Sequence, residues 1–276
     1  MAKGCSFLHI TLLIGTLLFQ SSGAKANEPK RYIPDDIEWQ LDIGLALSYG
    51  QTLIEGMYRN DRQLALSLLL SGGVYVDDFF IESSPLSQHP LTLGYVVHAD
   101  NKQQVNLIAE SWFSTIDAEE QYDTQVLDGL DARNASLEVG VEYLTTIGKM
   151  DLRVRLLHDA LGRHGGGLFS AELARQYYTR HALWMPSLGI TVVSSDAVDF
   201  YYGVRPHEAT LTRPVYTGST AWIGSARLYA ERPLGEDWSL IGFAGYAFFS
   251  DGIADSPIVG DRNDTFRVGM GVLWSF

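Results

Sequence analysis

The last residues of the chain alternate between large apolar side chains and smaller or polar ones, and this pattern constrains the fold more than any other feature. Every second position is apolar: Phe266, Val268, Met270, Val272, Trp274 and Phe276. The positions between them include Arg267, Gly269, Gly271 and Ser275. A period of two over about ten residues is typical of a tilted membrane strand that turns one face to lipid. The alternative is a closing strand of a periplasmic β-sandwich.

The N-terminal residues predict export. An apolar run, residues 7–19, follows Lys3, and the small and polar stretch 20–26 comes next. The run is shorter than the roughly 20 residues that a membrane-spanning helix needs, and Ala24-Lys25-Ala26 offers an A-x-A cleavage site. We therefore predict a signal peptide at residues 1–26. With it, the aromatic end of the chain is similar to the assembly signal of outer-membrane barrels.

Charge and cysteine content argue against several classes of function. Without Lys3 and Lys25 the chain keeps 18 basic residues against 33 acidic ones, a net charge of −15. Nucleic acid is therefore not an expected partner, because it is a polyanion. The single cysteine, Cys5, lies in the predicted signal peptide, which leaves the mature chain no thiol for a disulfide, a lipid anchor or a metal.

Mean hydropathy near zero, with 12% aromatic residues, fits a barrel whose strands are apolar on one side only. No stretch after residue 26 is long and apolar enough for a membrane helix. The first mature strand, 39–49, has apolar side chains at its odd positions and Asp42 among the even ones. Because a carboxylate cannot face lipid, the odd positions must.

Counting strands gives an up-and-down antiparallel barrel of about twelve strands, with ten or fourteen as alternatives. Similar stretches occur at about 63–71, 91–98, 105–115, 134–145, 150–158, 167–177, 183–193, 220–231 and 237–249. With both terminal strands these make eleven, and single-chain bacterial barrels have an even number. A hairpin turn at Gly72-Gly73 adds a strand at 74–81. Long connections then alternate with short ones, and the long ones should face outward.

Tryptophan positions in this register predict two aromatic girdles. The periplasmic rim should carry Trp39, Trp184, Trp238 and Trp274, and the outer rim Trp112 and Trp222.

Each candidate chemical site also has a purely structural interpretation. His158-Asp159 with Arg163-His164 could form a metal or acid/base cluster, but Gly162 and the run 165–167 favour a solvated loop. A surface Ser-His-acid hydrolase could use His98 and Glu110, yet no serine lies in a nucleophile-elbow pattern. The stretch 162–167 lacks the residues of a phosphate loop.

Charged residues elsewhere are expected to pair or to be solvated. Charged groups in strands are expected to fill the lumen by pairing: Glu138, Glu142, Arg153 and Arg155. The acidic segments Asp117 to Asp131 and Asp251 to Asp255, with Asp261 and Asp264, could bind divalent cations or simply hydrate the outer face. We expect no catalytic, cofactor-binding or metal-binding residues and no cofactor, and we leave the ligand-binding residues open.

Four segments, read together, match the sequence pattern of a known family. They are Leu127 to Arg133, Trp184 to Gly189, Tyr201 to Ala209 and Ala254 to Val259. Taken in order over essentially the whole mature chain, this sequence resembles the MltA-interacting protein family, also called the MipA/OmpV family. The Tyr-Tyr-Gly-Val and Asp-Ser-Pro elements, when they occur together, are specific to this family. The early loop 51–62 diverges from the family pattern, and the loops are unusually acidic.

The resemblance implies location in the outer membrane and no enzymatic activity. It implies a scaffold that links a murein transglycosylase to a peptidoglycan synthase, with outer-membrane lipid as the surroundings. The alternative is a surface-exposed barrel acting in adhesion, osmotic response or small-solute permeation. We expect a signal peptide at 1–26, a periplasmic N-terminal segment at 27–38 and the barrel at 39–276. A scaffold should bind its partners through the periplasmic turns and the N-terminal segment.

Overall fold

The structure is a computed structural model that describes residues 37–54, 62–83, 91–116 and 126–276. The predicted signal peptide and most of the predicted periplasmic segment lie outside the described residues. The strands of the described residues are β1 (Glu38–Gln51), β2 (Arg62–Val76), β3 (Phe79–Ser83), β4 (Thr92–Ala99), β5 (Gln103–Glu110), β6 (Glu138–Ile147), β7 (Met150–Asp159), β8 (Gly167–Ala174), β9 (Tyr177–Tyr178), β10 (Leu183–Val193), β11 (Ala221–Pro233), β12 (Trp238–Phe249) and β13 (Asp264–Ser275). The same residues contain two short helices, α2 (Ser195–Tyr202) and α3 (Asp251–Ala254).

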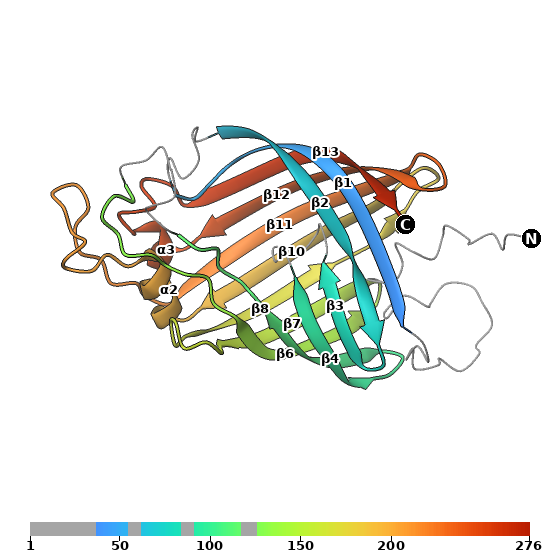
Figure 1. The fold of residues 1–276 in the computed structure, drawn as a ribbon, viewed down its shortest axis with the longest axis horizontal. Coiled ribbons are helices and arrows are strands. Elements are labelled where there is room, and N and C mark those ends of the chain that lie inside the picture. Colours follow the sequence, from blue (N-terminus) through green and yellow to red (C-terminus); the bar gives the residue numbers. More distant parts are fainter. Residues whose placement is uncertain (1–36, 55–61, 84–90, 117–125) are drawn as a thin grey trace, which may run out of the picture.

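These strands close into an antiparallel barrel (Figure 1). Each strand pairs with its neighbours in sequence, and β13 pairs with β1 to close the wall. The two residues of β9 continue β8 along β10, so that twelve strands form the wall, as predicted. The described part of the chain has no helix with the length and hydropathy that a membrane-spanning helix requires.

The predicted turn at Gly72-Gly73 is wrong. Both glycines lie inside β2, opposite Leu41 and Gln40 of β1, and the turn to β3 lies at Asp77-Asp78. A Cβ on Gly72 would lie 2.1 Å from the Gln40 carbonyl oxygen, so this glycine permits close approach of two strands. The number of strands is unchanged, because the predicted strand 74–81 is divided between β2 and β3.

The two faces of the wall differ as the alternation predicts. In β1, the side chains of Leu45 and Leu47 are exposed on the outside of the barrel, and Asp42, Ala46 and Ser48 are buried. The leucines of β2 at 64, 66, 68 and 70 extend this apolar outer face. The outside of the barrel is therefore a surface for lipid, and the polar groups of the strands point inward.

The two ends of the barrel differ in the length of their connections. Figure 1 shows α2, α3 and the long loops at one end, and the C-terminus with the short turns at the other. Because outer-membrane barrels have long loops outside and short turns inside, the end with α2 and α3 faces the cell surface.

Five of the six tryptophans fit the predicted girdles. Exposed at the periplasmic end are Trp39, Trp184, Trp238 and Trp274, and at the outer end Trp222. Trp112 is different, because its indole N–H donates to the buried Glu110 carboxylate at 2.6 Å and its ring packs inside the barrel. The girdle prediction is wrong for this residue, since a position near a strand end does not fix the side to which the ring points.

Candidate functional site in the outer loops

The outer loops pack on one another and form a cap on the barrel, which we call the outer cap. Its apolar core contains Leu53, Ile54, Ile116, Leu127, Leu130, Val193, Ala197, Val198, Val204, Ala221, Ile253, Ile258 and Val259. These residues come from four different loops and from both helices. Since no single loop could bury them alone, the outer cap depends on segments that are far apart in the sequence.

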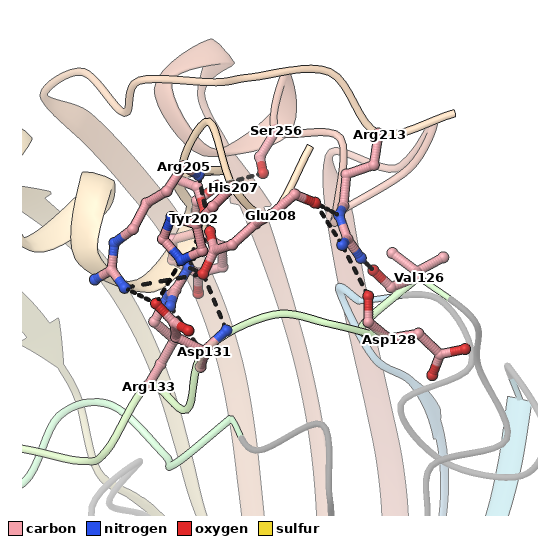
Figure 2. Close-up of polar contacts among 11 residues, drawn as sticks. Val126, Asp128, Asp131, Arg133, Tyr202, Arg205, His207, Glu208, Arg213 and Ser256 are labelled. Carbon is pink, nitrogen blue, oxygen red and sulfur yellow. Dashed lines mark hydrogen bonds and ion pairs between the residues drawn. The ribbon is translucent and has the colours of Figure 1, made fainter. Parts of the chain in front are cut away.

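A buried ion pair joins two of the loops (Figure 2). Arg133 donates from one guanidinium nitrogen to both carboxylate oxygens of Glu208, at 2.7 and 2.8 Å. The exposed fractions of these side chains are only 2% and 0%. The backbone N–H groups of Asp131 and Arg205 also donate to Glu208, at 3.0 and 2.8 Å. The carboxylate is therefore fully hydrogen-bonded, as burial of a charge requires.

Arg213 ties the same loop to the backbone of residues 126–128. Its guanidinium donates to the carbonyl oxygen of Glu208 at 2.7 Å, to that of Asp128 at 2.8 Å and to that of Val126. Because it satisfies three carbonyl oxygens at once, Arg213 holds a stretch of irregular backbone in place. The helices are fastened in a similar way, since the Ser256 hydroxyl donates to the Tyr202 carbonyl oxygen at 2.5 Å.

The exposed edge of the outer cap carries a small group of possible metal ligands. Asp131, His207 and Glu208 have ligand atoms within 4.8 Å of one another. Both carboxylates already have cationic partners, because Arg205 donates to Asp131 at 2.6 Å and Arg133 to Glu208. A divalent cation would have to displace these guanidinium groups, so the arrangement is that of an ion-pair cluster.

Hydrogen bonds keep the outer-cap carboxylates ionised. Burial acts to raise the pKa of Glu208, but the hydrogen bonds from Arg205 and Arg133 outweigh it and hold the pKa below its usual value. Hydrogen bonds from His207 and Arg205 lower the pKa of the exposed Asp131 carboxyl. Glu208 and Asp131 therefore stabilise the outer cap in the pH range in which both carboxylates are charged.

Below the outer cap, charged side chains on the inner face of the wall pair with one another, as predicted. Arg155 lies between Glu142, at 2.8 Å, and Glu110, at 3.2 Å, and Arg153 is 3.4 Å from Glu142. Asn106 donates to Glu142 at 3.0 Å and completes its shell. These groups lie on the neighbouring strands β5, β6 and β7, along the inner face of the wall.

The prediction of a solvated loop at residues 158–167 is wrong for two of its members. Asp159 and His164 are buried, and Asp159 accepts hydrogen bonds from the backbone N–H groups of His164 and Gly165. The His164 ring lies 3.1 Å from Glu138, so the turn folds inward over the lumen. The glycines do mark a turn, as Gly162 and Gly165 have positive φ, and His158 and Arg163 are exposed as expected, but Asp159 and His164 point inward.

The residues considered for a hydrolase lie apart. His98 is opposite Val105 in the pairing of β4 with β5, at the periplasmic end, and its ring is 3.4 Å from Asp100. Glu110 is at the other end of β5, where it contacts Thr92, Trp112 and Arg155. The structure therefore does not bring the two residues together into a triad.

Three of the four segments that carry the family resemblance meet in the outer cap. Leu127 to Arg133, Tyr201 to Ala209 and Ala254 to Val259 supply the ion pair, part of the apolar core and the Ser256 hydrogen bond. Trp184 to Gly189 lies in β10 instead. The acidic segment 117–125 and loop residues 55–61 lie outside the described residues. Sequence reasoning missed the roles of Glu208 and Arg213, although both lie in or beside a quoted segment.

Comparison with known proteins gives the same family. The sequence model of the family described as MltA-interacting protein MipA matches residues 43–276. The YiaT protein of Escherichia coli (strain K12) is 25% identical over 238 residues, which are 86% of this chain and 91% of that protein. Outer membrane protein OmpV of Vibrio cholerae is 24% identical over 87% of each chain. The MltA-interacting protein of Escherichia coli (strain K12) is 28% identical over 53% of this chain and 59% of its own length.

Proposed function

This chain belongs to the MltA-interacting protein family of outer-membrane proteins, and from that premise we propose that it is a non-enzymatic scaffold for murein-processing enzymes. The scaffold holds a murein transglycosylase and a peptidoglycan synthase together at the periplasmic face of the outer membrane. The name of one relative, MltA-interacting protein, supports the first of these partners.

One structural observation favours contact over transport. Ion-paired side chains fill part of the lumen, and the outer cap lies over its outer end with Val198 and Ile253 fully buried. A twelve-stranded barrel has little free interior once side chains occupy it. The function is therefore assigned to the surface of the barrel, and small-solute permeation becomes the alternative that an experiment must test.

The proposed contact surface is the periplasmic turns, which face the murein, together with the predicted periplasmic segment 27–38. Leu234 offers a way to test this choice within the described residues. It lies in the turn between β11 and β12, and the residue is 55% exposed. A single exposed apolar side chain is not a patch, so Leu234 serves as a probe of this surface.

Affinity purification tests the proposal. The tagged protein is purified in detergent from envelope extract, and co-purified murein transglycosylase and synthase are quantified. We expect both to be enriched over a control barrel, with a several-fold loss in Leu234→Ser. The matched control is Leu211→Ser, which removes a fully exposed leucine at the outer end. Recovery of neither enzyme with the wild-type protein would refute the scaffold.

Planar-bilayer recording tests the alternative function, permeation by small solutes. A scaffold with an occupied lumen should give no steady conductance after insertion of the purified barrel. Reproducible single-channel steps would favour permeation instead. Purified protein should also leave lipid esters uncleaved, and turnover that depends on one serine or histidine would overturn the non-enzymatic assignment.

A further inference from the structure

One periplasmic hairpin extends past the wall of the barrel. β8 pairs with β7 only as far as Ala174, opposite Asp151, and the chain then continues through β9 and back into β10. Figure 1 shows this turn and the next one, between β11 and β12, extending beyond the other turns at the end where the C-terminus lies. We call residues 175–184 the basic hairpin.

The tip of the basic hairpin is held by its own hydrogen bonds. The Thr179 N–H and hydroxyl both donate to the Ala182 carbonyl oxygen, at 2.9 and 2.8 Å, and the Ala182 N–H donates back to the hydroxyl at 3.1 Å. Arg180 and His181 are the two residues inside this closed turn, and both are exposed. Their backbone is therefore fixed before any ligand arrives, which lowers the entropy cost of binding.

The charge of this hairpin is opposite to that of the chain. Residues 173–195 contain no aspartate or glutamate, although the chain has 33 acidic residues. The guanidinium of Arg175 lies 4.4 Å from the ring centre of Tyr177, and none of the ion pairs among the described residues involves Arg175, Arg180 or His181. Elsewhere on the same rim, the turn between β2 and β3 consists of Asp77-Asp78.

Aromatic rings accompany the free cations. Tyr177 is opposite Trp184 and so shares its lipid-facing side, whereas Tyr178 is opposite Leu183 and is 62% exposed. A tyrosine ring offers a flat apolar face with a polar edge, which suits a sugar ring, and guanidinium groups bind carboxylates in a fork. The turn that carries Arg180 lies beyond both tyrosines, on the side away from the membrane.

We propose that the basic hairpin is a binding site for murein, a glycan whose peptide stems carry free carboxylates. Arg180, with His181 beside it, binds a stem carboxylate, and the exposed face of Tyr178 packs against a sugar ring. The site faces the compartment that holds this polymer, and its charge complements an anionic ligand. This site does not depend on the enzyme partners of the proposed scaffold, so either proposal can fail alone.

Co-sedimentation with purified murein sacculi tests the site. The detergent-solubilised protein is mixed with sacculi at low and at moderate salt, and the bound fraction is measured after centrifugation. We expect wild-type protein to bind, with binding reduced several-fold by added salt because the contact is electrostatic. Arg180→Gln combined with His181→Gln should reduce the bound fraction several-fold. Tyr178→Ser should reduce it less.

A matched variant controls for a general loss of positive charge. Lys102→Gln removes a cation from the turn between β4 and β5, at the same end of the barrel but beside Asp100, and should leave binding unchanged. Heat-modifiable gel mobility confirms that each variant is a folded barrel. Equal binding by the double variant and the wild type would overturn the proposal, as would absence of binding by the wild type. Binding to phosphatidylglycerol vesicles in place of sacculi, lost in the same double variant, would overturn it in favour of lipid.

Discussion

The two ends of this barrel are stabilised by different kinds of contact. At the outer end, Arg133 and Glu208 are 75 residues apart in the sequence, and four loops share one apolar core. At the periplasmic end, turns are closed by bonds between near neighbours, such as those of Asp100 with the N–H groups of Lys102 and Gln103. The outer cap should therefore open as one unit, whereas each periplasmic turn can change by itself.

The largest effect should come from breaking the buried ion pair. Glu208→Leu leaves the Arg133 guanidinium buried without its partner, which typically costs about 3–5 kcal/mol. We expect the outer loops to become sensitive to protease while the barrel still shows folded gel mobility. Glu236→Leu, an exposed acid in a periplasmic turn, is the matched control and should change neither readout. Resistance of Glu208→Leu equal to that of the wild type would contradict the idea of a cooperative outer cap.

A smaller effect is expected from a cavity in the outer-cap core. Ile253 is fully buried, and its replacement by alanine should cost about 2–4 kcal/mol through lost contacts and an empty space. Protease cleavage in loops that do not contain Ile253 would show that the damage spreads. Leu66→Ala serves as the comparison, because Leu66 is 72% exposed on the lipid side and should leave the outer loops protected.

Acid should weaken the outer end selectively. The pKa of Glu208 is lower in the folded protein than in the unfolded chain, so its stabilising contribution is complete above the unfolded value, about 4.3. That contribution is lost as pH falls through the lower folded pKa, and Asp131 changes in the same direction. Protease sensitivity of the outer loops should thus rise only in strong acid. In Glu208→Gln this acid dependence should be reduced, and an unchanged profile would contradict the assignment.

The smallest effect should come from a periplasmic turn. Thr179→Val removes the hydroxyl bonds that close the basic hairpin, and a net loss of at most about 1 kcal/mol is expected because solvent can replace them. Barrel folding and the protection of the outer loops should be unchanged in a proteolysis assay. If Thr179→Val exposed the outer loops to protease as much as Ile253→Ala does, the two ends of the barrel would not be independent.

Much of the wall could be predicted from the sequence, since a period of two records which side each residue faces. Asp42 identified the inner face of β1, and the even number of strands gave the count. The position of the second turn was wrong, because Gly72 fits both a hairpin turn and a close contact between strands. The local sequence does not contain the Gln40 carbonyl oxygen that decides between them.

The candidate site was harder to predict. Segments around Arg133, Tyr201 and Ser256 stood out only through their resemblance to a family, and nothing in their spacing places them in one outer cap. Asp159 and His164 were expected to be solvated because glycines surround them. Their burial depends on Glu138 of the neighbouring strand β6 and on the rings of Phe113 and Tyr201, which other loops bring against His164.

The sequence by itself determined that this protein is an outer-membrane barrel, which side of the first and last strands faces lipid and which loops are long. Those properties follow from local alternation and from the cost of a polar group in hydrocarbon, and both can be read residue by residue. Only the tertiary structure decided that the long loops form a packed outer cap and that Arg133 meets Glu208. Such contacts join residues that are far apart in the sequence and lie in irregular backbone, where no sequence periodicity predicts them.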